Sequence, residues 1–366
     1  MLRKIGRYLG YVLLWIALIV VWRWAVGGKE EHSRTQQVMS VDISIAGGGS
    51  RQLVDAALMQ EWFTKHDVNP EGRPLAEVNL ADMERVALQH SAIASANAYI
   101  THDGRVDVRL SQREPVARLR VDGYDMYIAS DGYVFPASDG YAVLVPVITG
   151  DYRPIFAADH SGFVSERVCD SVARLQATIE RLEKDKEPYY KQQQRYRKEL
   201  RSTLNSSVRR ELFMSDYEFA KRKEELAERK VEAQREYDDR TEKVDEELAA
   251  LSLRQDAVRE QQRYVEQAGC DFESLLGFIA EVNADRFWSA EVVQIVITGG
   301  GTKPMQVAMV PRSGRFEVDM GSAANIDGRL RTLRRVYDKV LVNVGWDKYR
   351  TISLRYDGQV VCSAAN

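Results

Sequence analysis

A stretch of about a hundred residues without glycine constrains the fold of this chain more than any other feature of the sequence. It lies between Gly162 and Gly269, and nearly half of its residues are charged, with both signs mixed. Such a composition is typical of a solvated helix. The sequence on both sides combines alternating apolar residues with turn-forming residues, which predicts β-strands. The chain must therefore leave a β-rich region, form a long helical element and return.

Each half of the helical stretch carries one apolar stripe at heptad spacing, so each half needs a partner for that stripe. The simplest solution is an antiparallel coiled-coil hairpin over residues 163–270, and the alternative is a coiled coil between two chains. The stripe of the first arm contains Val168, Val172, Leu175, Ile179, Leu182, Tyr189, Tyr196 and Leu200, with polar Lys186 and Gln193. The stripe of the second arm contains Phe219, Leu226, Ala233, Tyr237, Val244, Leu248, Leu251, Val258 and Val265, with polar Lys223, Lys230, Thr241, Gln255 and Gln262.

Local signals place the turn and the starts of the arms. TLNSSV (Thr203–Val208) is the best turn, and Ser215 with Glu218 forms a capping box that would start the second arm. Pro188 is expected to kink or interrupt the first arm, because proline lacks a backbone N–H and clashes with the preceding turn. Arms of about 35 and 50 residues would span roughly 50 to 75 Å at 1.5 Å per residue.

The amino-terminal segment contains an uncharged apolar run. YLGYVLLWIALIVVW (Tyr8–Trp22) extends to residue 28, which gives about the 20 residues that span a bilayer, so residues 8–28 are predicted to form a transmembrane anchor. Arg3, Lys4 and Arg7 precede it. The positive-inside rule then places residues 1–7 in the cytoplasm and the bulk of the chain in the periplasm. The alternative is a cleaved signal peptide.

The residues after the anchor predict a small domain over 38–115. Its elements follow one another in the order strand, helix, helix, strand, strand, within about 75 residues. Gly47–Gly49 ends the first strand, and Asn79 is suited to cap the second helix. The elements are expected at Val41–Ile45, Leu53–Lys65, Leu80–Gln89, Ala94–Thr101 and 105–111.

Composition and motifs argue against several classes of function. With 51 basic and 54 acidic residues the formal charge is −3, which lacks the basic excess of proteins that track a phosphate backbone, so no nucleic-acid partner is expected. The five histidines are scattered without metal-ligand spacing, and the sequence has no GxSxG, no P-loop and no GxGxxG after a strand. The acidic residues of the hairpin are interpreted as a solvated helix face. The sequence therefore predicts no metal, no cofactor and no enzymatic activity.

Cys169 and Cys270 stand at the two ends of the hairpin, in a region expected to be exported to a compartment where disulfides form. A bridge would close a loop of about 100 residues and stabilise the neck of the hairpin by several kcal/mol. The alternative is two independent thiols that lie too far apart to bond. Cys169 and Cys270 are thus a candidate disulfide, whereas Cys362 has no partner in either case and is expected to be a small core residue.

Several motifs occur in one order: REPVA at 113–117, VPVITG at 145–150, FWSAEVVQIVI at 287–297, VPRSGRFEVDMG at 310–321 and LRYDGQVVC at 354–362. In this arrangement the chain resembles the FtsQ/DivIB family of bitopic division proteins, in the form found in Bacteroidetes-like bacteria. The resemblance implies an α+β fold with a single transmembrane helix and a POTRA-like domain at 38–115. It also implies a β domain in two parts, 116–162 and 271–366, with the coiled-coil hairpin inserted between them.

In the family, the VPVITG motif is soon followed by a short helix. That helix is expected here at Phe272–Asn283, with Asp271 as its N-cap. The hairpin therefore has no counterpart in the usual family pattern and is an insertion within the β domain.

The resemblance also implies a function. Proteins of this family are non-enzymatic divisome scaffolds that join the small coiled-coil proteins FtsB and FtsL. Through them they regulate the septal peptidoglycan synthases FtsW and FtsI. The chain is accordingly expected in the inner membrane at the division septum, attached through one helix.

The carboxyl-terminal residues are the expected contact with the partner. TISLRYDGQVVC (Thr351–Cys362) alternates as one half-exposed strand and, as the last strand, is expected to form a sheet edge. In FtsQ-like proteins the FtsB partner docks by adding a strand to this end of the β domain. The family's LRYD motif places contact on Arg355 and Tyr356. The predicted site comprises Leu354, Arg355, Tyr356, Asp357, Gly358, Gln359 and Val360.

Two other functions stay open at this point. A periplasmic adaptor of an export pump also has an amino-terminal anchor and a helical hairpin that interrupts a β domain, but lipoyl halves should flank that hairpin. The flanks here are VPVITG and FWSAEVVQIVI instead. A peptidoglycan hydrolase or its activator would need a catalytic site, which the sequence lacks, or a partner that it does not name. Division scaffolding is therefore the leading hypothesis.

Overall fold

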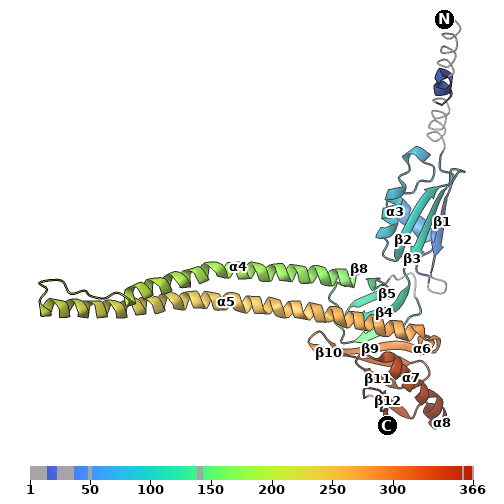
Figure 1. Ribbon diagram of the computed structural model, residues 1–366. Coiled ribbons are helices and arrows are strands. Elements are labelled where there is room, and N and C mark those ends of the chain that lie inside the picture. Colours follow the sequence, from blue (N-terminus) through green and yellow to red (C-terminus); the bar gives the residue numbers. More distant parts are fainter. Residues whose placement is uncertain (1–14, 23–36, 48–51, 138–142, 357, 365–366) are drawn as a thin grey trace, which may run out of the picture.

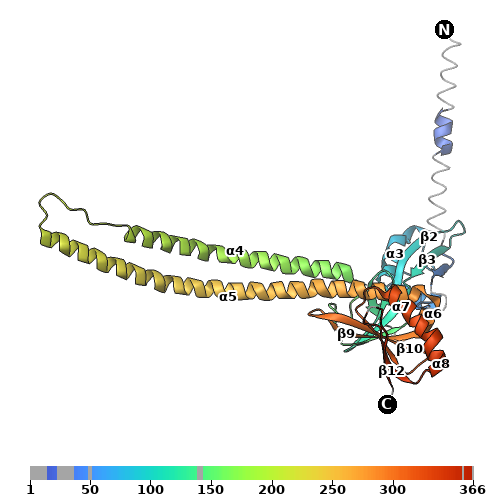
Figure 2. The same ribbon diagram turned by 60° about the horizontal axis from the view of Figure 1, so that its bottom comes forward.

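The computed structural model describes residues 15–22, 37–47, 52–137, 143–356 and 358–364 (Figure 1). Residues 15–22 are helical, but most of the predicted anchor at 8–28 lies outside the described residues. Within the part of the chain that is described, no helix is both long and apolar enough to cross a membrane. Two sheet-containing domains are present, and a long pair of helices projects sideways from the second (Figures 1 and 2).

The first domain is a three-stranded sheet with two α-helices, in the order that the sequence predicts. β1 (Val41–Ala46) lies parallel to β3 (Val106–Gln112), which pairs antiparallel with β2 (Ile93–Ile100). The helices are α2 (Ala56–Lys65) and α3 (Leu80–Gln89), with a short 3₁₀ turn at Leu75–Glu77 between them. The apolar faces of these elements form one core.

Side-chain caps set the starts of both helices. α3 begins where expected, because Asn79 accepts a hydrogen bond from the amide of Asp82 (3.2 Å). α2 begins at Ala56, later than the expected Leu53, because Asp55 is its N-cap. The amide of Leu53 donates instead to Oε1 of Gln112 in β3 (3.0 Å).

The second domain contains one ten-stranded mixed sheet built from both sides of the helical insertion. The strand order is β13-β12-β11-β10-β9-β7-β4-β5-β6-β8. The two parts of the sequence meet where β7 (Val147–Gly150) lies parallel to β9 (Val292–Gly300). The other strands are β4 (Pro115–Val121), β5 (Tyr124–Ala129), β6 (Tyr133–Pro136), β8 (Gly162–Phe163), β10 (Lys303–Pro311), β11 (Glu317–Gly321), β12 (Tyr349–Ser353) and β13 (Val361–Ala364).

The join between the two parts requires a glycine. Gly150 has φ +106°, and a Cβ atom there would lie 2.1 Å from the carbonyl oxygen of Ile297. Any side chain would therefore push β7 away from β9. This gives a physical reason for the last residue of the VPVITG motif.

Helices supply much of the core of the second domain. The last turns of α5 (Asp216–Ala284) and α7 (Ile326–Val336) bury their apolar faces with strand residues such as Leu119 and Ile295. The remaining helical segments are α6 (Arg286–Glu291), a π-helical turn at Tyr337–Leu341 and α8 (Val342–Val344).

Strand β5 connects the two domains. Met126 and Ile128 belong to the core of the second domain, whereas Tyr127 and Ala129 belong to the core of the first. Because alternate residues of a strand point to opposite faces, β5 is buried on both sides. The first domain therefore packs against the second and shares a core with it.

The insertion is an antiparallel helical hairpin, as the heptad stripes predict. α4 (Val164–Leu204) packs along α5. Ile179, Leu182, Val244 and Val265 of the two stripes are buried. Ser215 and Glu218 form the expected capping box at the start of α5.

The structure corrects the expectation that Pro188 could interrupt the first arm. α4 is one helix of 41 residues with Pro188 inside it. Pro188 and Lys184, whose carbonyl loses its helical partner, are both exposed. Water can therefore satisfy that carbonyl, while packing against α5 holds the helix together.

The expected separate helix at Phe272–Asn283 is also wrong. α5 is continuous over 69 residues, from Asp216 to Ala284. Asp271 lies inside it, buried, and accepts hydrogen bonds from the amide of Gly301 (2.8 Å) and from Nε2 of Gln267 (3.0 Å). The arms are unequal because α5 continues from the hairpin into the core of the β domain.

Candidate partner-binding site

The carboxyl-terminal segment folds as a β-hairpin, so the expected single edge strand Thr351–Cys362 is wrong. β12 pairs antiparallel with β13. In the turn between them the amide of Gln359 donates to the carbonyl of Tyr356 (3.2 Å), and Gly358 has φ +74°. A residue in this conformation ends a continuous strand. At this end of the sheet the edge strand is therefore β13.

The outer side of β13 presents backbone groups that an added strand can pair with. The amide of Leu354 donates to the carbonyl of Asp319 in β11 (2.8 Å). Because backbone groups alternate along a strand, Ser353 then directs its N–H and C=O toward β13. Val361, the register partner of Ser353, points its backbone groups inward, and Cys362 points its N–H and C=O outward.

Asp319 fixes the start of the turn. Its carboxylate accepts hydrogen bonds from the amide of Gly321 (3.0 Å) and from Oγ of Ser353 (3.0 Å), and lies 3.4 Å from Nε of Arg355. Gly321 has φ +71°, and a Cβ atom there would come within 3.3 Å of Cα of Arg355. The ion pair is half exposed on the arginine side, and such pairs contribute at most about 1 kcal/mol. Arg355 therefore lies on the surface, and its ion pair with Asp319 contributes little to holding the side chain in one position.

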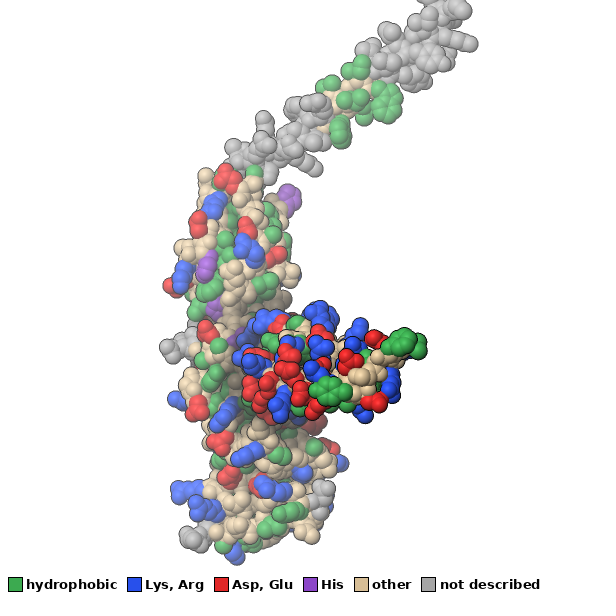
Figure 3. Space-filling model, turned by 90° about the vertical axis from the view of Figure 1, so that its left-hand side faces the viewer, with side chains coloured by type: hydrophobic (Ala, Val, Ile, Leu, Met, Phe, Trp, Pro, Cys, Tyr) green, Lys and Arg blue, Asp and Glu red, His purple; other side chains and the backbone are tan. Residues whose placement is uncertain are grey.

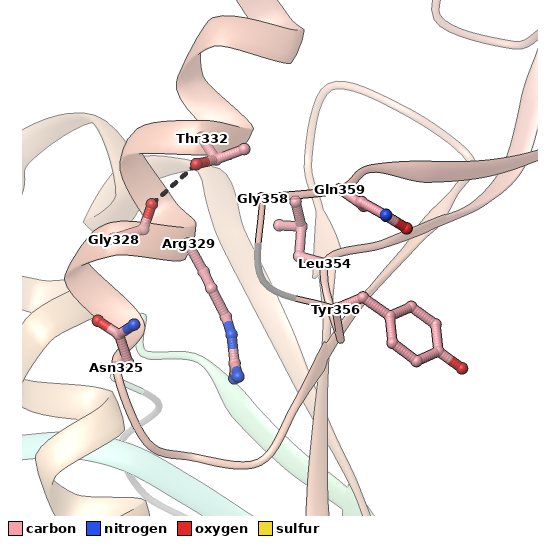
Figure 4. Close-up of a pocket in the computed structure, with 8 residues that line it drawn as sticks. All are labelled: Asn325, Gly328, Arg329, Thr332, Leu354, Tyr356, Gly358 and Gln359. Carbon is pink, nitrogen blue, oxygen red and sulfur yellow. Dashed lines mark hydrogen bonds between the residues drawn. The ribbon is translucent and has the colours of Figure 1, made fainter.

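The predicted site residues divide into buried and exposed groups. Leu354 is 2% exposed and belongs to the core, and Val360 is half-buried against the same core. Tyr356 is 60% exposed, and its ring points away from helix α7 (Figure 4). Gly358 and Gln359 are mostly exposed, and Asp357 lies outside the described residues. The outward-facing surface of the site is therefore formed by Tyr356, its neighbours in the turn, and β13.

A pocket of about 210 Å³ lies between this turn and helix α7 (Figure 4). Its walls are Asn325, Gly328, Arg329 and Thr332 on the helix side and Leu354, Tyr356, Gly358 and Gln359 on the turn side. The sequence prediction missed the helix side. The spacing of Asn325, Gly328 or Arg329, and Thr332 at three- and four-residue intervals could have shown that they share one helix face.

Arg329 holds the wall of this pocket in place. Its Nη1 donates to the carbonyls of Met320 and Ser322, at 2.7 Å each. Its Nε is buried and has no hydrogen-bond partner among the described residues. The pocket therefore combines a cationic group with an apolar floor from Leu354, which suits a mixed polar and apolar side chain of a bound segment.

The titratable groups near the site do not favour nucleophilic chemistry. Desolvation by burial raises the pKa of the Cys362 thiol, which keeps it protonated near neutral pH. Among the residues that the structure describes, no three His, Cys, Asp or Glu side chains are grouped so that they could hold a metal ion. What the site offers is backbone hydrogen bonding and aromatic surface.

The three cysteines are unpaired in the structure. Cys169, Cys270 and Cys362 are all free and exposed, which matches the alternative of two independent thiols at Cys169 and Cys270, and the candidate bridge is not formed in the structure. Cys362 is on the edge strand rather than in the core, because the turn at Tyr356–Gln359 moves it onto β13.

Comparison with protein families assigns both domains. A model described as a POTRA-like domain matches residues 36–111, which extend from before β1 into β3. A model described as FtsQ/DivIB, C-terminal related matches residues 245–363, which extend from the middle of α5 into β13. No curated protein matches the chain. The chain therefore combines a POTRA-like domain with an FtsQ/DivIB C-terminal related domain, from which a long helical hairpin projects.

Proposed function

We propose that the chain is a non-enzymatic scaffold of the cell-division machinery that binds an FtsB/FtsL-like partner at β13. The combination of a POTRA-like and an FtsQ/DivIB C-terminal related domain supports a role in cell division. The observation that carries the binding proposal is the outward-facing backbone edge of β13 beside the exposed Tyr356. Residues 8–28 anchor the scaffold in the inner membrane, and the partner transmits its effect to FtsW/FtsI-like septal synthases.

Binding would proceed by strand addition. A strand of the partner extends the ten-stranded sheet, and the backbone of Cys362 forms the first new pair of hydrogen bonds. Tyr356 then covers the added strand, and aromatic side chains of this kind often dominate interface energies. The pocket beside α7 receives one side chain of the partner.

The backbone contact is tested by removing one amide proton. Cys362→Pro deletes the outward N–H, and proline is tolerated at an edge strand where that N–H faces solvent. Cys362→Ala is the matched control, because it changes the same side chain and keeps the N–H. Affinity of the detergent-solubilised full chain for the purified FtsB/FtsL-like pair should fall at least tenfold in Cys362→Pro and stay unchanged in Cys362→Ala. Equal affinities of two folded variants would exclude strand addition at β13.

The aromatic contact is tested separately. Tyr356→Ala should lower affinity by about 2 kcal/mol or more while the thermal midpoint stays nearly unchanged, because the side chain is mostly exposed. Tyr217→Ala removes an exposed tyrosine from the far end of the hairpin and serves as the control. If Arg355→Glu and Tyr356→Ala together leave binding intact, the partner does not use this turn.

A further inference from the structure

Helix α5 extends beyond α4 at the far end of the hairpin. Nζ of Lys230 donates to the carbonyl of Leu204, the last residue of α4 (2.6 Å). The first turns of α5, from Asp216 to about residue 229, therefore continue past the end of α4 by about 20 Å at 1.5 Å per residue. Figure 1 shows that only the connecting segment runs along this overhang. We call residues 205–230 the tip.

The tip exposes large apolar side chains. Leu212 is 90% exposed, Phe213 is 103% exposed and Tyr217 is 79% exposed. Phe213 also has φ +83°, a strained conformation for a bulky residue. The backbone of the connecting segment thus holds a phenyl ring entirely in solvent.

The same tip contains an apolar groove of about 320 Å³. It lies where α4 no longer covers the apolar stripe of α5. Phe219, Leu226 and Ala227 of α5 form its base with Val208 of the connecting segment, and Ser206, Ser207, Lys223 and Lys230 complete its walls. An apolar projection and an apolar groove therefore occur within one short stretch of chain.

We propose that the tip is a self-association site, at which Phe213 and Leu212 of one copy enter the groove of a second copy and the reverse contact forms at the same time. Because each copy carries both a projection and a groove at its tip, two copies can exchange the same contact, which a two-fold symmetric interface requires. The inference concerns a surface remote from β13 and goes beyond the proposed function.

The charge pattern favours a second copy over an anionic membrane or an acidic protein. Residues 205–230 contain seven basic and six acidic side chains, and Figure 3 shows both signs interspersed around the hydrophobic side chains at this end. Such a surface gives no net attraction to an anionic membrane or to an acidic protein. An antiparallel contact centred near Lys223 sets Lys221 and Arg222 of each copy against Glu225 and Glu224 of the other.

The size of the contact predicts a weak interface. Buried aromatic side chains contribute about 150–250 Å² each, so the three exposed residues of both copies would bury about 1,000 Å² in total. This is at the low end for specific complexes, and association should be concentration-dependent. Because α5 runs unbroken from the tip to the core, two copies would hold their β domains on the order of 130 Å apart at 1.5 Å per residue.

Photocrosslinking of the full chain tests the contact and identifies the occupant. With p-benzoylphenylalanine in place of Leu212, irradiation should give a covalent homodimer whose crosslinked peptides both come from residues 205–230. Leu253 is the matched control position, because it is a 74% exposed leucine on α5 away from the tip, and it should give no dimer. Crosslinks from position 212 to another protein, to lipid, or to nothing would each overturn the proposal.

Sedimentation equilibrium of the purified full chain gives the second measurement. Leu212→Glu with Phe213→Glu should raise the dimer dissociation constant at least tenfold, and Leu253→Glu should leave it unchanged. Because Leu212 and Phe213 are almost fully exposed, both variants should keep the wild-type helical content. A folded double variant that still dimerises would place self-association elsewhere. Binding of the division partner at β13 should be the same in all of these variants, which separates this test from that of the proposed function.

Discussion

The two parts of helix α5 differ in their surroundings: one lies in the hairpin and the other in the core of the β domain. In the hairpin the helix is mostly solvated, and its stripe includes a polar layer in which Nζ of Lys186 donates to Gln255 (2.6 Å), whose Nε2 donates to Glu183 (2.9 Å). At the base the same helix buries Phe272, Leu275 and Phe278 in the largest core of the protein. One helix therefore joins a polar, extended arm to an apolar core.

We call α4 and the part of α5 that packs along it the arm, and the last turns of α5 the base. The difference indicates that the arm fixes the register of the hairpin, whereas the base supplies folding free energy. Buried polar groups that are fully hydrogen-bonded fix the register of a coiled coil but add little net free energy. Buried apolar side chains supply most of the folding free energy. The arm and the base should accordingly respond differently to the same substitution.

The largest expected difference comes from a matched pair of leucines. Leu275→Ala at the base should destabilise the β domain by about 2–5 kcal/mol, because it leaves a cavity in a closely packed core. Leu182→Ala in α4 should leave that transition nearly unchanged, since Leu182 packs only within the hairpin. Denaturant unfolding of both variants measures the two values, and equal losses would show that the arm is part of the cooperative unit.

Pro188 offers a change confined to the arm. Pro188→Ala restores a helical hydrogen bond and should stabilise α4 locally by up to about 3 kcal/mol. Amide hydrogen exchange should slow in α4 around residues 184–192 and stay unchanged in the last turns of α5. Slower exchange at both ends of α5 would contradict the separation of arm and base.

The junction between arm and base depends on Asp271. Asp271→Ala leaves the partly buried amide of Gly301 without this acceptor and should cost about 1–3 kcal/mol. The control is Asp256→Ala, which removes an exposed carboxylate on the same helix. Unfolding midpoints of the two variants give the comparison, and a neutral Asp271→Ala would show that the contact with Gly301 is replaceable.

Sequence reasoning succeeded where one local signal decided the structure. Asn79 starts α3, the Ser215–Glu218 box starts α5, and the heptad stripes form the hairpin. The two caps depend on residues within one turn of each other, and each stripe depends on a spacing that repeats along one helix. Their physical cause can be read directly from spacing.

Sequence reasoning failed where contacts between residues far apart in the sequence decided the structure. Asp271 looks like an N-cap in sequence, but burial of the following apolar residues in the core keeps α5 helical, and its carboxylate turns to Gly301 instead. Apolar and polar residues alternate in the carboxyl-terminal segment through residue 362. The hydrogen bond from Leu354 to Asp319 and the turn at Gly358 nevertheless divide the segment into two strands. Part of the site surface was therefore foreseen, while its true edge strand and the α7 side of its pocket were not.

The smallest expected effect is that of removing the arm entirely. Val168 and Gly269 lie against each other at the neck, since a Cβ atom on Gly269 would be 3.1 Å from the side chain of Val168. A short Gly/Ser linker in place of residues 170–268 therefore joins two points that are already close, at little entropic cost. The deletion keeps Asp271 and the apolar base of α5, and it removes only Val265 and Ala268 from the buried residues at the neck. The β domain should unfold cooperatively, with its free energy of unfolding lowered by no more than about 1–2 kcal/mol. The variant should still bind the partner at β13, and it should lose the ability to dimerise. Loss of cooperative unfolding in this variant would show that the arm and the base of α5 form one structural unit.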